Sequence, residues 1–389
     1  MQNRVHRVLF SLLRQEVCGL NLDEETKNLI TPEMLPILYK LSKTHDLAHL
    51  IADALDKNDL FSADNEMRKR FLQERNVAVY RYEQMQYELD EICRILEEEK
   101  IEYIPLKGSV LRAYYPEPWM RTSCDIDILI KEADLERAVE RLSQKLGYKK
   151  GARATHDIPL YSPSNVHIEL HFSLLEDNMA NNASSILNDV WDRVETTPDS
   201  YKKTLQDEFL YYYHIAHMAK HVEFGGCGIK PFLDLWLLNE KVAFHQEKRD
   251  ELLLVGGLKQ FETIVKSLTY VWFENKEGID ATKKLEEYIL TGGVYGSTEN
   301  KVAAQAGKKG RGLRYIISRI WCPYDLLKKR YPRVVKCKLL IPYYQFRRWL
   351  RFLLAGEKRK SIIEAKLSKE LSNEKAESVQ IMLKEIGLQ

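Results

Sequence analysis

The stretch DIDILI, residues 125–130, most constrains the fold of this chain. It is a short apolar run of the kind that forms a buried strand, yet it carries two aspartates. Because neighbouring side chains of a strand point to opposite faces, Asp125 and Asp127 must share a face. Two adjacent carboxylates repel each other and are costly to bury, so a positive charge is expected beside them. A divalent cation with oxygen ligands is the most economical candidate.

Apolar residues recur at helical spacing on both sides of this strand. The segments 33–57 and 67–100 precede it, and the clearest later ones are 209–222, 230–242 and 257–275. Such spacing is typical of helices that bury one face. The Gly-rich stretch TGGVYGSTEN then interrupts the pattern. We therefore expect helical regions before and after a central α/β unit.

The central unit combines strand-like runs with one helix. The runs are IEYIPLKG, DIDILI and VHIELHFSL, and the helix between the last two ends at Gly147. This pattern predicts an α+β fold, with a mixed sheet, flanking helices, and helical regions at both ends of the chain. The expected division is an N-terminal helical region at 1–98, an α/β core at 99–200, a helical domain at 201–295, and a basic, mostly helical region at 296–389.

Composition places the chain among globular proteins of a reducing compartment. Hydrophobic residues make up 44% of its 389 residues, which is enough for buried cores. The six cysteines are scattered and include no C-x-x-C pair, so neither a zinc cluster nor a disulfide framework is predicted. No stretch approaches the roughly 20 apolar residues that span a bilayer, and no secretory signal is evident. We expect a cytoplasmic protein without a membrane span.

Basic residues are concentrated near the C-terminus, although the net charge is only +2. Residues 301–360 hold 18 Lys and Arg but only 2 acids, Asp325 and Glu357. Aromatic residues are interleaved with them, as in IPYYQFRRWLRFLL. Such a surface can contact RNA, an anionic membrane surface or an acidic substrate. It can equally pack on the acidic remainder of the same chain, and the sequence leaves these alternatives open.

A Gly-Ser turn lies upstream of the two aspartates. Gly108 and Ser109 stand at a strand-to-helix turn, where backbone N–H groups and the hydroxyl can hold phosphates. Arg121 and Lys107 are candidates to neutralise a triphosphate. Either side chain can instead pair with a nearby carboxylate.

Glu169 supplies a third carboxylate from a later strand. It alternates with His167 and His171, so all three side chains share one face, which can meet the face of the two aspartates. Three carboxylates are the usual minimum for a two-metal phosphoryl- or nucleotidyl-transfer site. His171 can orient Glu169 or touch substrate, although a strand histidine is more often a hydrogen-bonded structural group.

Three histidines and an aspartate stand out in the predicted helical domain. His214, His217 and His221 lie along one helix face. No fourth zinc ligand is evident, so packing or substrate contact is favoured over a metal site. Asp234 lies in an apolar helix and should have a partner, for which one of these histidines is our guess. His217 and Asp234 are therefore candidate substrate contacts.

These motifs resemble a known superfamily. LKGS, DIDILI and VHIELHF are similar to the nucleotidyltransferase superfamily that includes DNA polymerase beta, with its Gly-Ser turn, its h-D-h-D-h strand and a third acidic residue on another strand. The longer runs YIPLKGSVLRAYYPEPWMRTSCDIDILI, VHIELHFSLLE and YPRVVKCKLLIPYYQFRRWLR resemble the uncharacterised bacterial nucleotidyltransferase type 5 family, from about residue 75 to residue 355. The segment between Ser109 and Asp125 is longer than in compact members of the superfamily.

The resemblance implies a nucleotidyltransferase-type mixed sheet and a role for each motif. Asp125 and Asp127 match the metal-binding aspartates, Glu169 matches the third carboxylate, and Gly108 and Ser109 match the phosphate-holding turn. The implied reaction moves a nucleoside monophosphate from an NTP to a hydroxyl of a small molecule or sugar, with Mg²⁺ or Mn²⁺, and releases pyrophosphate. The alternatives are toxin-type modification of tRNA or protein, and a nucleotide-binding protein without transfer.

Overall fold

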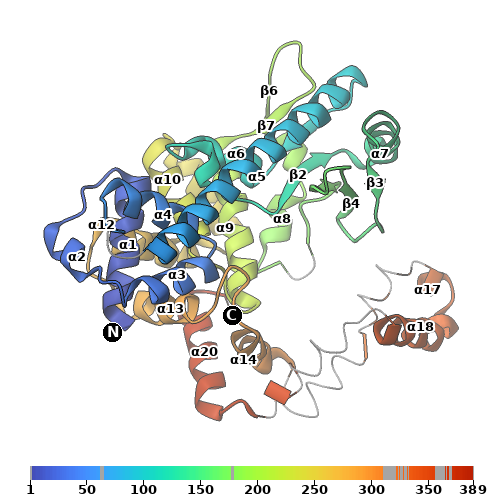
Figure 1. Ribbon diagram of the computed structural model, residues 1–389. Coiled ribbons are helices and arrows are strands. Elements are labelled where there is room, and N and C mark those ends of the chain that lie inside the picture. Colours follow the sequence, from blue (N-terminus) through green and yellow to red (C-terminus); the bar gives the residue numbers. More distant parts are fainter. Residues whose placement is uncertain are drawn as a thin grey trace.

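The computed structural model describes residues 2–61, 65–176, 179–309, 321–322, 324, 327, 331, 333–354, 364, 366–367 and 370–388. The fold is α+β, as the sequence predicts, with a mixed sheet and many flanking helices. The sheet lies toward one end of the molecule and a helical body toward the other (Figure 1). Parts of the basic tract 301–360 lie outside the described residues.

Helices make up most of the described chain. The α-helices are α1 (Gln2–Cys18), α2 (Glu24–Leu29), α3 (Leu35–Thr44), α4 (Ala48–Lys57), α5 (Asn65–Glu98), α6 (Gly108–Leu111), α7 (Glu132–Leu146), α8 (Ala183–Leu187), α9 (Asp207–Glu223), α10 (Lys230–Lys241), α11 (Gln246–Val255), α12 (Lys259–Glu274), α13 (Asp280–Leu290), α14 (Thr298–Lys309), α17 (Arg333–Lys336), α18 (Ile341–Leu354) and α20 (Asn373–Glu385). The 3-10 turns are η1 (Arg112–Tyr114), η2 (Pro118–Met120), η3 (Val190–Asp192) and η4 (Lys338–Leu340). None of these described helices has the length and apolarity needed to cross a bilayer.

The main sheet has five strands in the order β1-β2-β5-β4-β3. They are β1 (Tyr103–Pro105), β2 (Asp125–Ile130), β3 (Lys149–Lys150), β4 (Asp157–Tyr161) and β5 (His167–His171). Strands β2 and β5 are parallel, and the other neighbours are antiparallel. A second, two-stranded sheet pairs β6 (Val194–Thr196) with β7 (Lys203–Leu205).

Three of these strands match the predicted ones, whereas β3, β4 and the β6–β7 pair were not predicted. Pro159 lies in the middle of β4, and proline is a poor guide to a strand because it cannot donate to the ladder. Strand β3 is only the exposed pair Lys149–Lys150. Short, polar or Pro-containing strands of this kind are specified by their neighbours in the sheet, so the local sequence does not reveal them.

The two faces of β2 have different neighbours. Ile126, Ile128 and Ile130 are all buried in one hydrophobic cluster with residues of α5 and α7. Helix α7 contributes Leu135, Ala138, Val139 and Leu142, which recur at helical spacing, and it ends at Gly147 with a left-handed backbone. Because side chains alternate along a strand, Asp125 and Asp127 lie on the other face, away from α5 and α7.

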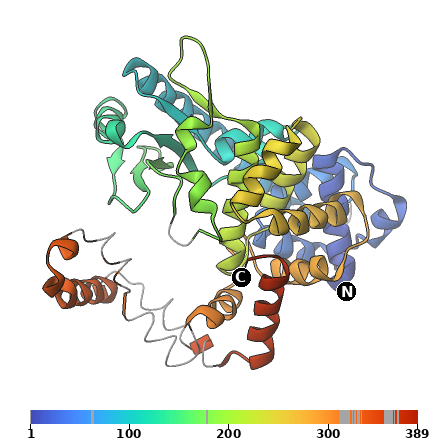
Figure 2. The same cartoon turned by 180° about the vertical axis from the view of Figure 1, so that it is seen from behind.

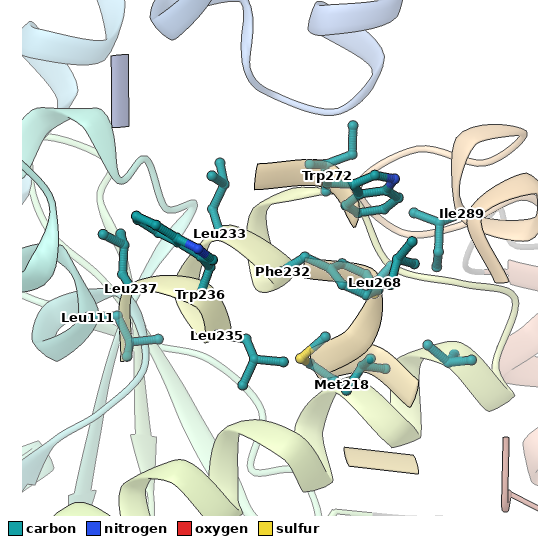
Figure 3. Close-up of a cluster of buried hydrophobic side chains, with 14 of the residues drawn as sticks. Leu111, Met218, Phe232, Leu233, Leu235, Trp236, Leu237, Leu268, Trp272 and Ile289 are labelled. Atoms are coloured by element: carbon teal, nitrogen blue, oxygen red, sulfur yellow. The ribbon is translucent and has the colours of Figure 1, made fainter. Parts of the chain in front are cut away.

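A second hydrophobic cluster fills the helical body and joins distant parts of the chain. It combines side chains of α1, α4, α9, α10 and α12 with others from α20. At its centre the ring of Phe232 lies 4.8 Å from the ring of Trp272, and Leu268 and Ile289 lie close by (Figure 3). Figure 2 shows the same body from behind, with α20 beside it. N-terminal and later helices share this core. The predicted division into four regions stays a prediction.

Helix α5 connects the two clusters. Its first half contributes Met67 and Phe71 to the helical body, and its second half contributes Met85 through Leu96 to the cluster beneath the sheet. In Figure 1 it runs from the body to the sheet as one continuous helix. Helices α5 and α7 cover the isoleucine face of β2. The face that carries Asp125 and Asp127 is the one that these two helices leave uncovered.

Candidate active site

The register of β2 and β5 brings the predicted carboxylates together. In this parallel pair Asp125 is opposite His167, Asp127 is opposite Glu169, and Leu129 is opposite His171. Because the pair is in phase, the alternate side chains of both strands share one face of the sheet. The three carboxylates that the sequence predicted as one site thus lie on adjacent strands.

Two overlapping groups of side chains on this face have the spacing of metal ligands. One is Asp125, His167 and Glu169, and the other is Asp127, Glu169 and His171, each with ligand atoms within 4.8 Å of one another. Glu169 belongs to both groups. His167 was noted in the sequence as sharing this face but was not assigned to the site, and only the strand register shows that it lies beside Asp125. Carboxylate oxygens suit Mg²⁺ and Mn²⁺, and the added imidazoles also suit softer divalent ions.

Lys107 compensates the buried aspartate. Its Nζ lies 2.7 Å from Oδ1 of Asp127, whose side chain is 3% exposed. The sequence left open whether this lysine meets a triphosphate or a carboxylate, and in this structure it pairs with a carboxylate. The backbone of Lys107 has φ 47°, ψ −121°, a conformation that costs a non-glycine residue on the order of 1–3 kcal/mol and is typical of functional turns.

His171 holds Asp127 and Glu169 in place. Its Nε2 lies 2.8 Å from Oδ1 of Asp127 and 3.3 Å from Oε2 of Glu169, and its side chain is buried. Burial lowers the pKa of His171, but the two carboxylates outweigh burial and raise it. Burial likewise raises the pKa of Asp127, but Lys107 and His171 outweigh it and hold that pKa well below its usual range. His171 therefore acts as the hydrogen-bonded group that the sequence favoured.

Asp125 carries the unbalanced charge of the site. Burial, followed by the charges of Asp127 and Glu169, raises its pKa to about 6. The hydrogen bond from His171 keeps the pKa of Glu169 below its ordinary value. Three carboxylates thus share Lys107 and His171 as compensating groups. This excess of oxygen donors fits a divalent cation.

The Gly-Ser turn lies directly after Lys107, and α6 packs beside β2. A Cβ atom on Gly108 would lie 2.8 Å from Oγ of Ser123 and 3.0 Å from its Cβ, so any other residue here would force Ser123 to shift. The Oγ of Ser109 is buried and has no hydrogen-bond partner among the described residues. Buried hydroxyls are normally paired, so this one is a candidate to bind a ligand.

Arg121 forms a buried ion pair with Asp234. Its Nε lies 2.8 Å from Oδ1 and its Nη2 2.9 Å from Oδ2 of that carboxylate. Tyr115 donates to the same Oδ1 at 2.8 Å, whereas His214 donates to the carbonyl of Pro231. The partners of Asp234 are therefore Arg121 and Tyr115, not a histidine as guessed. Of its two open alternatives, Arg121 adopts carboxylate pairing in this structure.

A second polar contact holds the loop before β2. Lys230 of α10 donates to Oγ1 of Thr122 at 2.6 Å and to its carbonyl at 3.1 Å, and it also forms an ion pair with Asp46. The hydroxyl of Thr122 donates to Asp46 at 2.7 Å. Asp46 and Lys230 lie far from Thr122 in the sequence, which carries no signal for this contact. The loop leading into β2 is thus anchored to the helical body at two consecutive residues.

Helix α9 faces the carboxylates with a polar edge. His217 and His221, whose Nε2 atoms lie 3.2 Å apart, are half-buried there beside Lys220, which forms an ion pair with Glu176. Burial, followed by the neighbouring His221 and Lys107, holds the pKa of His217 well below its ordinary value, and burial with Lys107 lowers that of Lys220 to about 8. Among the described residues, these histidines are not part of a group with metal-ligand spacing.

Comparison with known proteins identifies a family for this chain. No curated protein and no solved structure matches the chain. The model of a family described as uncharacterised nucleotidyltransferase matches residues 35–263, which is more than half of the chain and contains the whole site. The chain belongs to this uncharacterised nucleotidyltransferase family.

Proposed function

We propose that the chain is a metal-dependent nucleotidyltransferase that moves a nucleoside monophosphate from an NTP to a hydroxyl group of a small molecule or sugar. Pyrophosphate is the leaving group, and the oxygen of the acceptor forms the new bond to the α-phosphorus. The observation that carries the proposal is the parallel register of β2 and β5, which sets Glu169 opposite Asp127 and beside Asp125. Membership of the nucleotidyltransferase family supports the reaction class.

The carboxylates are the proposed metal ligands. Asp125, Asp127 and Glu169 would hold Mg²⁺ or Mn²⁺, with His167 as a further donor. When bound, the metal neutralises triphosphate charge and lowers the pKa of an attacking hydroxyl. We also propose Glu169 as the group that accepts the proton of the acceptor hydroxyl, because its side chain is more exposed than that of Asp127.

The turn and the lysine are the proposed phosphate contacts. The unpaired hydroxyl of Ser109 can donate to a phosphate oxygen, and Gly108 lets the backbone approach it closely. Lys107 compensates Asp127 in this structure, and a metal at Asp127 would free its ammonium group for phosphate. Arg121 is not part of the proposed triphosphate site, because Asp234 and the carbonyl of Thr122 occupy its guanidinium.

The polar edge of α9 is the proposed substrate side of the site. His217 and Lys220 are half-buried, and the charge of Lys107 contributes to lowering the pKa of both side chains. Their neutral and cationic side chains offer hydrogen bonds to a polar acceptor or to phosphate. His217 thus remains a candidate substrate contact, whereas Asp234 is buried and engaged by Arg121 and Tyr115.

The test compares transfer with metal binding. The wild-type chain, Asp127→Asn and the matched control Glu140→Gln, an exposed residue of α7, are incubated with each α-labelled NTP, Mg²⁺ or Mn²⁺, and fractionated small-molecule acceptors. We expect label transfer with the wild type and the control but not with Asp127→Asn. Mn²⁺ binding measured by electron paramagnetic resonance provides a readout that needs no acceptor. The proposal fails if Asp127→Asn matches the wild type in both assays.

A further inference from the structure

The tail segment that contains α17, η4 and α18 has a small hydrophobic core of its own. Val334 and Tyr344 are buried in it with Leu327. The rings of Tyr331 and Tyr344 stack with their centroids 4.5 Å apart. The inward side of α18 is therefore already packed. In Figures 1 and 2, α17 and α18 lie together at one side of the molecule.

A backbone contact fixes which side of α18 points inward. The side chain of Gln345 accepts a hydrogen bond from the backbone N–H of Cys322 at 3.2 Å and donates to its carbonyl at 2.7 Å. Tyr344, the preceding residue, is buried with it. Because these two neighbouring residues face the segment's own core, the opposite side of the helix is set outward.

That outward side is apolar. Tyr343, Phe346 and Leu350 recur at i, i+3 and i+7, so they form one stripe, and they are 56%, 56% and 43% exposed. Leu339 in η4 and Val335 in α17 are also exposed, at 89% and 59%. We call these five side chains the tail surface. Their exposure is not a sign of a missing inner core, because other residues already fill that core.

Basic side chains flank the tail surface. Arg333, Lys338 and Arg347 are exposed. Between residues 326 and 354 the sequence holds nine Lys and Arg and no Asp or Glu. An apolar stripe beside a purely basic flank is the pattern of a helix that lies in the interface of an anionic membrane.

The kind of apolar side chain distinguishes a membrane from RNA. Single-stranded RNA is held by base stacking on aromatic rings, to which Val335, Leu339 and Leu350 cannot contribute. The transfer of these aliphatic side chains from water to acyl chains is favourable in free energy, and Tyr343 and Phe346 suit the headgroup boundary. We propose that the tail surface docks on an anionic lipid membrane, with the three aliphatic residues inserted and the basic residues at the headgroups. The proposal is independent of the transfer reaction.

The test uses the full-length chain and sucrose-loaded vesicles of phosphatidylcholine with or without phosphatidylglycerol. We expect co-sedimentation with the anionic vesicles, at least about tenfold stronger than with neutral ones, and weakening as salt is raised. The double variant Phe346→Ser, Leu350→Ser should lose at least about tenfold in partitioning. Arg347→Gln with Lys338→Gln should lower binding to anionic vesicles only.

The matched control is the double variant Tyr80→Ser, Leu254→Ser, because these two apolar residues are 67% and 66% exposed on other helices. It should sediment like the wild type. The variants of the tail surface and of its control change exposed side chains, so their thermal unfolding should match that of the wild type. The active-site variant Asp127→Asn should still bind vesicles.

Three results would overturn the proposal. The first is that the wild type stays in the supernatant with anionic vesicles at low salt, or that Phe346→Ser, Leu350→Ser sediments unchanged. The second is salt-sensitive RNA binding without vesicle binding. The third is self-association that the double variant abolishes, again without vesicle binding, which would assign the tail surface to a second copy of the chain.

Discussion

Arg121→Gln offers a sharp test of how the site is built, because two roles for Arg121 make opposite predictions. If the arginine binds triphosphate, the substitution lowers NTP affinity and leaves stability almost unchanged. If it anchors the loop before β2, the substitution leaves the buried carboxylate of Asp234 without its ion-pair partner and lowers the stability of the fold. The ion pair in the structure favours the second outcome.

The magnitude follows from the burial of the pair. The side chains of Asp234 and Arg121 are 0% and 13% exposed. Removing Arg121 deletes three contacts to Asp234, from Nε to Oδ1 and Oδ2 and from Nη2 to Oδ2. Among the described residues, the carboxylate then keeps the hydrogen bond from the hydroxyl of Tyr115. An uncompensated buried charge of this kind costs about 3–5 kcal/mol. The double variant Arg121→Gln, Asp234→Asn should cost less than the sum of the two single variants, because it buries no charge.

Urea unfolding followed by circular dichroism measures this cost. The matched control is Arg68→Gln, which breaks the more exposed pair of Arg68 with Asp56, at 51% and 26% exposure, and should cost less than about 1 kcal/mol. Equal stability of Arg121→Gln and Arg68→Gln, together with a lower NTP affinity of Arg121→Gln alone, would refute the anchoring role.

Four further predictions concern the site itself. In the folded protein Asp125 has a pKa of about 6, above its ordinary value, so the metal-free protein becomes more stable as the pH falls through 6 and this carboxylate is protonated. At pH 7.5 the carboxylate is charged and destabilises the metal-free fold. Asp125→Asn removes that charge and should raise the free energy of unfolding at pH 7.5 by roughly 1–3 kcal/mol. For the same reason, Mn²⁺ affinity measured by calorimetry should fall as pH drops below 6, and a flat profile would contradict this. Gly108→Ala should lower thermal stability and transfer together, costing about 1–3 kcal/mol, because its Cβ would meet Ser123. His217→Asn should reduce kcat/KM without changing Mn²⁺ affinity, and loss of both would place His217 among the metal ligands.

The acidic half of the site could be predicted from the sequence because its signals are local. The alternation of Asp125 and Asp127 with isoleucines predicts a strand and assigns both carboxylates to one face. The same argument gives the face of Glu169. Only the register between the two strands was missing, and the structure supplies it as a parallel pair. That register also places His167 beside Asp125, where the sequence alone shows only that His167 shares the face of Glu169.

The supporting contacts could not be predicted because they join residues far apart in the chain. Arg121 and Asp234 are 113 residues apart, and Lys230 and Asp46 are 184 apart. An arginine in a loop and an aspartate in an apolar helix each require a partner, but nothing local says which one. The helix that precedes Asp234 in the sequence carries three histidines, so a histidine was the expected partner. The structure pairs Asp234 with Arg121 instead.

These long-range contacts bear on how the proposed metal ligands are positioned. Arg121 and Thr122 immediately precede β2, and the helical body holds them through Asp234, Lys230 and Asp46. Strand β2 is thus fixed laterally by the sheet and at its start by the body, so Asp125, its first residue, has little freedom to move. The matched family region begins before Asp46 and ends after Asp234, and so it contains every one of these anchors. It follows that the helices belong to the site as much as the sheet does, because the sheet holds β2 laterally but only the helical body anchors the residues that lead into its first aspartate.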